Sequence, residues 1–370
     1  MSFLDRRLFL KLTTFTLLAR QLEALAGPLK VLNKSTDEFI GLTSTHKIIY
    51  ERPEGIYTTP PGNIQLLNIS SGKVHKYSLP FFGHQIDQLP EKPDFGYTFE
   101  QYGRQGALVN LTSGNIINSI EARKGNAFMG HCTFIKEKNW LITSEHNYVK
   151  KRGEIVIRDP FTLKEIDWIH SSGLFPHDCL YIPELKKVYV ANTGAHGKYK
   201  SNIAQIDPYK KNKTVTIPLV DGKLGHYAHF KFSKDNWLVV VPRKPPGRPI
   251  LINPENKPMT LPEPSEKVKG ILGIEFLKDT DLVAVTYPEN NLLHIWNYKT
   301  QKSIASCNLI GPRGIAEIDS NIKGQNTLLV TSEPDMLTYK VVLKNNKIIS
   351  AIKYDTDFGG KGAHLVKLIF

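Results

Sequence analysis

The chain has 370 residues, of which 41% are hydrophobic and 22% charged, and its formal net charge is +13. This is the composition of a globular protein with a core, and it excludes a disordered tail, a collagen and a coiled coil. Beyond the N-terminus, no apolar run approaches the roughly 18 residues that span a membrane. Three cysteines are too few for a disulfide framework, and their spacing is not that of a zinc ribbon.

The N-terminus has the three parts of an export signal. A basic start contains the adjacent pair Arg6 and Arg7, residues 12–19 are moderately apolar, and an A-x-A site ends at Ala26. The arginine pair followed by Leu-Phe-Leu-Lys is similar to a twin-arginine signal, which a bacterial machinery reads to export proteins that have already folded. We therefore expect the twin-arginine export machinery as a partner and a periplasmic location.

The alternative is that this segment is an amphipathic helix of the mature fold, which the charges of Arg20 and Glu23 favour. On the export interpretation, residues 1–26 are the signal peptide, 27–37 are a linker, and 38–370 form a single domain. The sequence leaves open whether the signal is cleaved or kept as an anchor.

From residue 38 onward the sequence predicts β-strands. Short runs rich in Val, Ile, Leu, Tyr and Phe are broken by Gly, Asn, Asp and Pro, and there is little helix periodicity. Clear examples in chain order are 140–143, 153–157, 187–191 and 237–241. This spacing of short strands is typical of all-β folds.

The strands recur in groups of four, and most groups open with a small residue or Pro, then His, then an apolar run. Four strands in every ~40–50 residues are typical of a β-propeller blade. The openings fall at His84, His131, His177 and His229, near Glu275, near Arg313, and at His364.

The two ends of the domain complete one another. Residues 38–79 offer three strands without a histidine opening, and 364–370 are one opening strand without successors. We therefore predict an all-β, seven-bladed β-propeller of the WD40/YVTN type, closed by pairing of the C-terminal strand with the first three strands. An open pair of β-sandwiches is the alternative.

The first strand of each propeller blade lines the central channel, so the opening histidines should converge at one channel mouth. The ends of the second strands reach the same face, where Glu145 is expected. Imidazole and carboxylate ligands suit iron, copper or zinc. The candidate metal ligands are His84, His131, His177, His229 and His364, with Glu145 or Glu333 as an oxygen ligand or as a group that orients a ring.

Two other interpretations of these histidines stay open. The rings can be structural pegs that hold the strand openings by hydrogen bonds, or they can bind an organic or anionic ligand. Cys132 and Cys179 follow two of the histidines at different offsets, so we expect buried small side chains rather than a disulfide or a shared metal. The sequence has no G-x-S-x-G, H-E-x-x-H, P-loop or Rossmann motif.

Several motifs together resemble one known family. They are the arginine pair, Gly130-His131, and the segments 143–148, 153–159, 176–178, 190–194 and 362–365. The chain resembles an uncharacterised bacterial family, a domain of unknown function, of exported seven-bladed propellers often encoded beside periplasmic iron-uptake proteins. The resemblance implies a periplasmic location, a role around iron and an iron-uptake protein as partner, but no catalytic residue. The positions that match its motifs are His131, Glu145, Asn147, His177, Asp178, Asn192 and His364.

The chain departs from this family pattern at two positions. Cys132 stands where a small residue such as glycine is usual, and His146 stands where asparagine is usual. The later blades match weakly, which puts shared ligand chemistry there in doubt.

Three classes of function are compatible with these observations. The first is a binding module for iron or another transition metal, or for an iron-uptake partner. The second is a propeller hydrolase such as a lactonase, or a redox enzyme, with a channel histidine paired with Glu145 or Asp178 as the base. The third is a scaffold for protein interactions. We expect no nucleic-acid partner, because the lysines are scattered and no basic helix or zinc finger accompanies them.

Overall fold

A computed structural model describes residues 38–45, 59–194, 200–210, 213–219, 226–243, 248–262, 269–320, 322–362 and 364–370. The predicted signal peptide and linker, residues 1–37, lie outside the described residues. Within the described ranges, no helix has the length and apolar character needed to cross a membrane.

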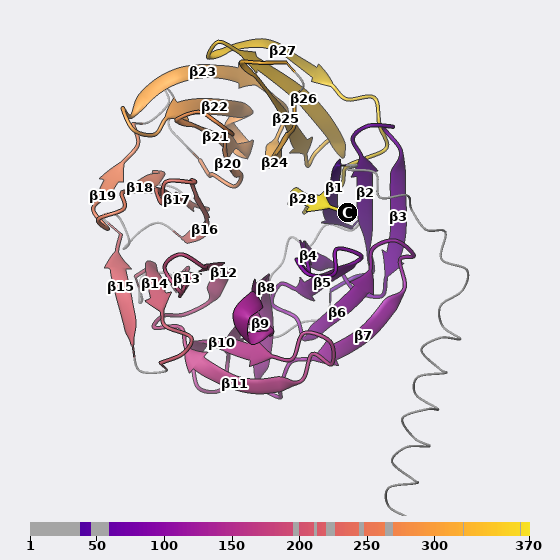
Figure 1. Ribbon diagram of the computed structural model, residues 1–370, viewed down its shortest axis with the longest axis vertical. Helices are drawn as coiled ribbons and strands as arrows, with labels where there is room; N and C mark the ends of the chain where they lie inside the picture. The colour runs from indigo at the N-terminus through magenta and orange to yellow at the C-terminus, as the bar shows by residue number, and fades with distance from the viewer. Residues whose placement is uncertain are drawn as a thin grey trace, which may run out of the picture. The chain divides into compact units, whose positions relative to one another are not determined.

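The described chain forms seven sheets of four strands each, which follow one another around a central axis (Figure 1). Blade 1 unites the last strand with the first three: β28 (Val366–Ile369), β1 (Glu38–Ser44), β2 (Gly62–Asn68) and β3 (Val74–Leu79). Blade 2 contains β4 (Gly83–Gln88), β5 (Phe95–Glu100), β6 (Gln105–Asn110) and β7 (Ile116–Glu121). Blade 3 contains β8 (Asn126–Ile135), β9 (Trp140–Asn147), β10 (Arg152–Arg158) and β11 (Glu165–His170).

The remaining four blades repeat this order. Blade 4 contains β12 (Pro176–Ile182), β13 (Lys187–Asn192), β14 (Asn202–Ile206) and β15 (Thr214–Pro218). Blade 5 contains β16 (Tyr227–Phe232), β17 (Leu238–Pro242), β18 (Ile250–Ile252) and β19 (Pro258–Thr260). Blade 6 contains β20 (Ile274–Phe276), β21 (Leu282–Tyr287), β22 (Leu292–Asn297) and β23 (Lys302–Asn308). Blade 7 contains β24 (Pro312–Ile318), β25 (Gln325–Ser332), β26 (Leu337–Lys344) and β27 (Lys347–Lys353).

Two single-turn 3₁₀ helices connect consecutive strands within a blade, one in blade 3 and one in blade 6. They are η1 (Lys136–Lys138), between β8 and β9, and η2 (Pro288–Asn290), between β21 and β22. Each ends at an asparagine with positive φ, Asn139 at 52° and Asn291 at 52°, which is the left-handed conformation that asparagine tolerates better than most residues.

The ring closes as the sequence predicted. Strand β28 pairs antiparallel with β1, and Leu368 lies opposite Phe39 and is fully buried. A Cβ atom at Gly41 of β1 would lie 2.7 Å from the Leu368 side chain, so the absence of a side chain there lets the last strand dock. Closure of this kind leaves the sheets without an unpaired seam in the ring.

The core lies between neighbouring blades. Inner strands such as β9 and β21 are buried along almost their whole length, whereas the outermost strands β7 and β27 are largely exposed. One apolar cluster joins blades 6 and 7 through Leu277, Ala284, Leu328 and Val341, among other residues. Each blade therefore buries its two faces against its neighbours, which is why a four-stranded repeat needs the closed ring.

Candidate metal centre

Five histidine rings meet in one cluster on the axis of the propeller. They come from the openings of blades 1 to 5, and the ring centroids lie between 4.5 Å (His84 and His364) and 6.4 Å (His84 and His229) apart in the recorded pairs. The members of this histidine cluster are His84, His131, His177, His229 and His364. Sequence reasoning named all five, and the structure brings them together.

A β-bulge at the start of the first strand aims several of these rings. The pairing register shifts between Gly83 and Ile86 in β4, between Phe128 and Cys132 in β8, and between Pro176 and Asp178 in β12. A bulge bends the strand locally and redirects a side chain. His84, His131 and His177 lie inside these shifts.

Gly130 makes room for the cluster. Its φ is 102°, in the region that glycine adopts readily, and a Cβ atom there would lie 2.5 Å from a ring carbon of His84. The Gly-His pair of blade 3 is thus explained by contact between the backbone of blade 3 and the ring of blade 2.

The histidines form two overlapping groups of potential ligands. One nitrogen from each of His84, His131 and His364 lies within 4.8 Å of the others, and the same holds for His131, His177 and His229. The Nε2 atoms of His84, His131 and His364 are buried and have no hydrogen-bond partner among the described residues. A buried polar atom left unpaired costs about 1–3 kcal/mol, so these three atoms call for a partner, which a bound ion or a buried water would supply.

The second group contains a pair of nitrogens at ligand spacing. The Nε2 atoms of His177 and His229 are 3.3 Å apart. Two imidazole nitrogens that bind one tetrahedral ion at about 2.0–2.1 Å are separated by about 3.4 Å. The distance therefore suits either a hydrogen bond between the rings or two ligands of one metal ion.

Polar neighbours orient two of the rings from outside. The side-chain amide nitrogen of Gln101 lies 3.0 Å from Nδ1 of His177, and a carboxylate oxygen of Asp178 lies 3.5 Å from Nδ1 of His131. Metal-binding histidines usually donate the ring N–H that faces away from the ion to an acceptor, as His131 can to Asp178. The Gln101 amide nitrogen is instead a donor, and its contact with Nδ1 places the ring proton of His177 on Nε2.

Burial keeps the rings neutral. Burial lowers the pKa of His131 to about 4. It also lowers the pKa of His84, His229 and His364 well below the ordinary value, and neighbouring histidines add to this effect. Neutral imidazole is the form that binds a metal ion.

Hydroxyl groups contact the backbone of several strand openings. The Ser144 hydroxyl lies 3.2 Å from the carbonyl oxygen of His131 and 3.3 Å from that of His177, which belong to neighbouring blades. In blade 6, Thr286 Oγ1 accepts a hydrogen bond from the Gly273 amide at 2.7 Å and donates one to the Arg313 carbonyl at 2.7 Å. The structural-peg interpretation had assigned this role, holding the backbone of the strand openings by hydrogen bonds, to the histidine rings.

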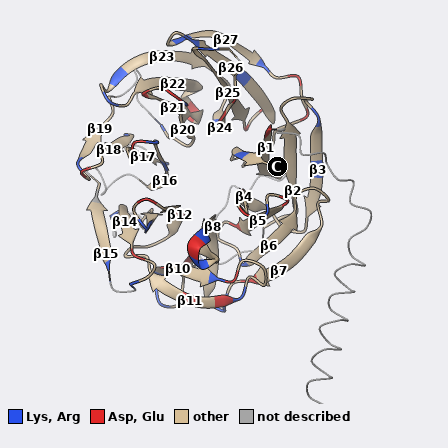
Figure 2. Ribbon diagram, in the orientation of Figure 1, with Lys and Arg blue, Asp and Glu red and all other residues tan. Residues whose placement is uncertain are grey.

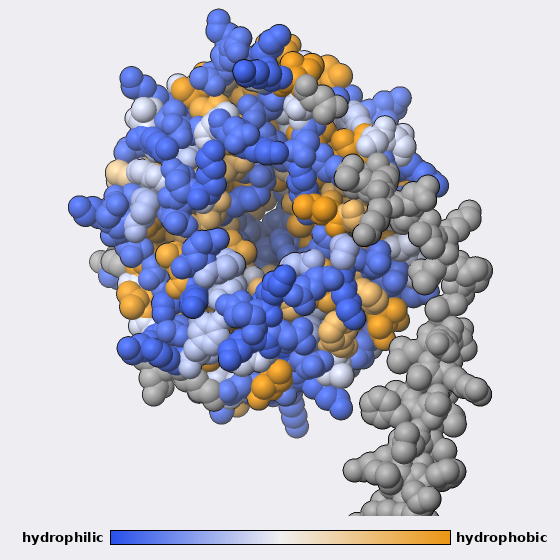
Figure 3. Space-filling model, in the orientation of Figure 1, coloured by the Kyte–Doolittle hydropathy of each residue, from blue (hydrophilic) through white to orange (hydrophobic). Residues whose placement is uncertain are grey.

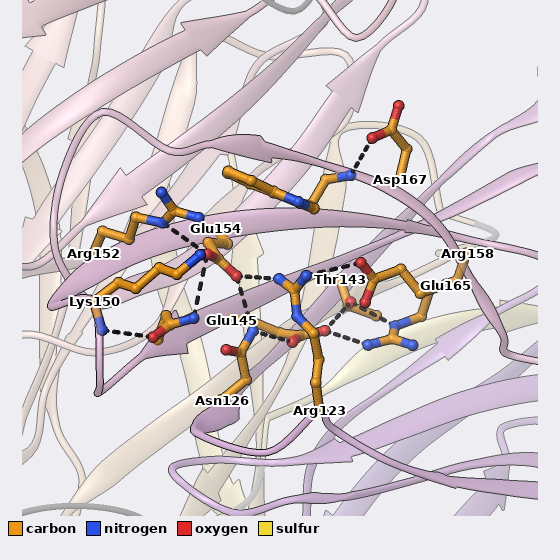
Figure 4. A network of polar contacts seen from close by, with 12 residues as sticks. Arg123, Asn126, Thr143, Glu145, Lys150, Arg152, Glu154, Arg158, Glu165 and Asp167 are labelled. Atoms are coloured by element: carbon orange, nitrogen blue, oxygen red, sulfur yellow. Dashed lines mark hydrogen bonds and ion pairs between the residues drawn. The ribbon is translucent and has the colours of Figure 1, made fainter.

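Glu145 lies apart from the cluster, in neither ligand group. Its carboxylate accepts hydrogen bonds from Arg158 at 2.5 Å, Asn126 at 2.9 Å and Thr143 at 3.0 Å, and it is fully buried (Figure 4). Side chains alternate along a strand: Ser144 reaches the strand openings, so the next residue points to the other face of β9. The expectation of Glu145 as a ligand or ring-orienting group therefore finds no support in its contacts.

A second buried carboxylate extends this ion-pair network. Glu154 of β10 accepts hydrogen bonds from Arg152 at 2.8 Å and Asn126 at 2.9 Å, and it pairs with Arg123 (Figure 4). Arg123 also pairs with Glu165 of β11 at 2.9 Å. The network ties the loop before blade 3 to that blade, which is a structural role.

Sequence reasoning missed Gln101 as a neighbour of the cluster. The residue directly follows β5, the second strand of blade 2. The rule that selected Glu145, that second strands end at the histidine face, applies equally to Gln101 and could have found it. The rule gives the face of the propeller but not the direction of each side chain.

The cysteines take no part in the ligand groups. Cys132 and Cys179 are free and buried, and Cys307 is free and partly buried. Cys132 donates a hydrogen bond to Asp87 at 3.3 Å. Burial raises the pKa of the Cys132 and Cys179 thiols well above the usual value, which leaves both as thiols.

The fold has many structural counterparts, at low sequence identity. A candidate 6-phosphogluconolactonase from Bacteroides fragilis superposes with a TM-score of 0.66 at 11% identity, covering 91% of this chain and 99% of that one. AztD from Citrobacter koseri gives 0.53 at 8% identity, with 90% and 98% covered. Hydrazine synthase from Kuenenia stuttgartiensis gives 0.52 at 17% identity, with 69% and 75% covered. At these identities the similarity shows the fold alone.

The sequence itself matches one family. No curated protein matches the chain at a significant level. Residues 77–230, which cover blades 2 to 4 and the opening of blade 5, match the profile of a family described as "Protein of unknown function (DUF1513)". The chain is therefore a seven-bladed β-propeller in which residues 77–230 carry the signature of an uncharacterised family, as the sequence motifs predicted.

Proposed function

We propose that this protein is an exported, periplasmic binding module that holds one first-row transition metal ion in the histidine cluster. The observation that carries the proposal is the trio His84, His131 and His364. Each keeps a buried Nε2 without a partner, and the three supply nitrogens within 4.8 Å of one another. A metal ion bound by this trio would give the buried rings a partner.

The donor chemistry restricts the ion. Imidazole nitrogens suit zinc, copper and iron, whereas calcium and magnesium prefer oxygen. The lowered pKa values keep the buried rings uncharged near neutral pH, so the cluster offers lone pairs rather than the positive charge that an anionic ligand would need. These properties favour a metal ion over an anion.

The cluster also has the outer support that metal sites use. Asp178 lies beside Nδ1 of His131 and can accept its ring proton, which leaves Nε2 of His131 free to bind an ion. The Ser144 hydroxyl contacts the opening backbone of blade 3, so on this proposal ligation explains the position of the His131 ring.

The resemblance to a family encoded beside periplasmic iron-uptake proteins supports iron as the cargo and a protein of iron uptake as the partner. On this proposal the propeller would receive or deliver the ion in the periplasm. The N-terminal arginine pair, Arg6 and Arg7, supports export of the folded chain.

Elemental analysis of protein purified from the periplasm tests the proposal. We compare wild type with a His84→Ala/His131→Ala variant and with a His75→Ala control, since His75 lies on β3, outside the cluster. The proposal predicts about one equivalent of iron, copper or zinc in wild type and control, and none in the double variant. Circular dichroism verifies that the double variant is folded.

Two results would overturn the proposal. One is wild-type protein that carries no transition metal and takes up none on addition of Zn²⁺, Cu²⁺ or Fe²⁺. The other is a folded double variant that retains the full metal content of wild type.

A further inference from the structure

The channel below the histidine cluster is acidic, although the protein as a whole is basic. A cavity of about 400 Å³ is lined by His131, His229 and His364 and by four carboxylates, Asp87, Asp178, Glu275 and Glu317. Only two ammonium groups, those of Lys231 and Lys367, share the lining. The chain as a whole carries a formal net charge of +13, and Figure 2 shows both signs spread around the ring.

The ammonium groups are largely neutralised by other residues. Lys231 pairs with Glu275, and Lys367 pairs with Glu38 at 2.8 Å and Asp319 at 3.1 Å, neither of which lines the cavity. Asp87 and Glu317 have no lysine or arginine partner among the described residues. Hydrogen bonds from Gln85, Cys132, the Lys278 amide and Asn326 hold these two carboxylates in place. By formal charge the lining thus carries an excess of carboxylates, while burial raises the pKa of Asp87 and raises the pKa of Asp178 to about 7.

The cavity leads away from the histidines toward the far ends of the first strands. A second hollow of about 570 Å³ shares Asp87, Cys132, Leu180, Val366 and Lys367 with the first. It also reaches Gln88 and Ile369, the last residues of β4 and β28, and Phe370. The two hollows therefore adjoin one another, and Figure 3 shows the ring hollowed at its centre.

The histidine end of this channel presents unsatisfied nitrogen atoms. His131 is 3% exposed, lines the cavity, and has a buried Nε2 without a hydrogen-bond partner among the described residues. His364 lines the same cavity with a buried, unpartnered Nε2. The acidic walls and the unpaired nitrogens are separate observations, and both favour a cation.

We propose that the acidic channel is the access route by which a hydrated dication reaches the histidine cluster. This inference rests on the proposed function, because it needs a metal site at the end of the route. Carboxylates in a cleft with low-dielectric walls focus the field, raise the local cation concentration and speed association. They also disfavour anionic chelates of the same metal, so the species admitted is the free aqua ion.

Stopped-flow mixing of apo protein with Co²⁺, followed by the visible absorption of the bound ion, tests the route. The test variant is Asp87→Asn/Glu317→Gln, which removes two channel charges while keeping side-chain size. The matched control is Glu289→Gln, which alters an exposed carboxylate in η2 on the histidine face that has no ion pair with any described residue. We expect the association rate to fall about three- to tenfold in the test variant and to stay unchanged in the control.

Ionic strength gives a second readout. Because salt screens exposed charges, raising NaCl from low to physiological concentration should slow association in wild type, and it should slow the test variant less. An unchanged rate in the test variant, or slowing in Glu289→Gln alone, would overturn the route while leaving the metal site intact. Absence of any Co²⁺ uptake by wild type would instead overturn the proposed function, and the route with it.

Discussion

Blades 1 to 5 and blades 6 and 7 solve the same structural problem, but only blades 1 to 5 bring histidines to the axis. In blades 6 and 7 a threonine of the second strand holds the opening backbone: Thr286 bonds the Gly273 amide at 2.7 Å, and Thr331 bonds the Gly314 amide at 2.9 Å. In blade 3 the hydroxyl of Ser144 contacts the opening backbone in the same way. In blade 3 His131 is therefore additional to a hydroxyl that contacts the opening backbone, whereas in blade 2 the Thr98 hydroxyl has no hydrogen-bond partner among the described residues.

Blade 7 shows what replaces a histidine. Arg313 lies in the bulge at the start of β24, and its guanidinium pairs with Glu333, which follows β25. This arginine has a carboxylate partner, whereas His84 and His131 keep unpartnered nitrogens. The contrast indicates that the axis is asymmetric, with a ligand side in blades 1 to 5 and a paired cation in blade 7.

The largest expected effect is on metal affinity, when the two kinds of opening residue are each replaced by alanine. His131→Ala removes the residue common to both ligand groups, so metal affinity should fall by more than the roughly 100-fold that loss of an outer partner costs. Arg313→Ala should retain the bound metal. Isothermal titration with Zn²⁺ measures both, and equal affinities in the two variants would contradict the asymmetry.

The next largest effect concerns stability and separates Glu145 from the cluster. Glu145→Ala leaves the buried Arg158 without its carboxylate, and breaking a buried pair in this way costs about 3–5 kcal/mol. Urea denaturation of the apo protein should reveal this loss. The folded fraction should bind Zn²⁺ as wild type does. A loss of Zn²⁺ affinity without a loss of stability would instead show that Glu145 contributes to metal binding.

A smaller loss is expected when a backbone-holding hydroxyl is removed. Thr286→Val leaves the Gly273 amide and the Arg313 carbonyl without their partner, at a cost of about 1–3 kcal/mol. Thermal melting checks the stability, and elemental analysis checks that the metal content is unchanged. If metal is lost while the melting temperature holds, the hydroxyl belongs to the metal site.

The smallest expected effect is a pH dependence of the apo protein. Burial holds the pKa of His131 at about 4, below the unfolded value of about 6.5, so the unfolded state binds more protons between these values. The resulting stability is present above pH 6.5 and is lost as pH falls toward 4. Between pH 7.5 and 6, His131 should account for roughly 1 kcal/mol. Denaturation at both pH values measures it as the difference between wild type and His131→Gln, and identical pH slopes would contradict the lowered pKa.

The sequence was sufficient to predict the fold because the start of most blades is marked by a recurring motif. Small residues or proline before histidine, at openings such as His84, His131 and His177, set the blade length, and the unmatched strands at the two ends required closure. The pairing of β28 with β1 confirms that reasoning. The propeller topology alone then predicted that these histidines converge on the axis, although side-chain directions could not be predicted.

The candidate site was only partly predictable, because it depends on direction as well as position. Glu145 and Gln101 both belong to the ends of second strands, but one points into an ion-pair network and the other contacts His177. Nor does spacing reveal that Gly130 makes room for the ring of His84, a contact between two blades. Such contacts arise only when neighbouring blades pack.

X-ray absorption at the edge of the bound metal tests the central claim most directly, because it counts the ligands. On Zn²⁺-loaded wild-type protein, the account predicts three or more imidazole nitrogens at about 2.0–2.1 Å and no sulfur, with at least one imidazole lost in His84→Ala. A shell of oxygen or sulfur ligands without imidazole, or a spectrum unchanged by His84→Ala, would contradict a metal centre built from the histidine cluster.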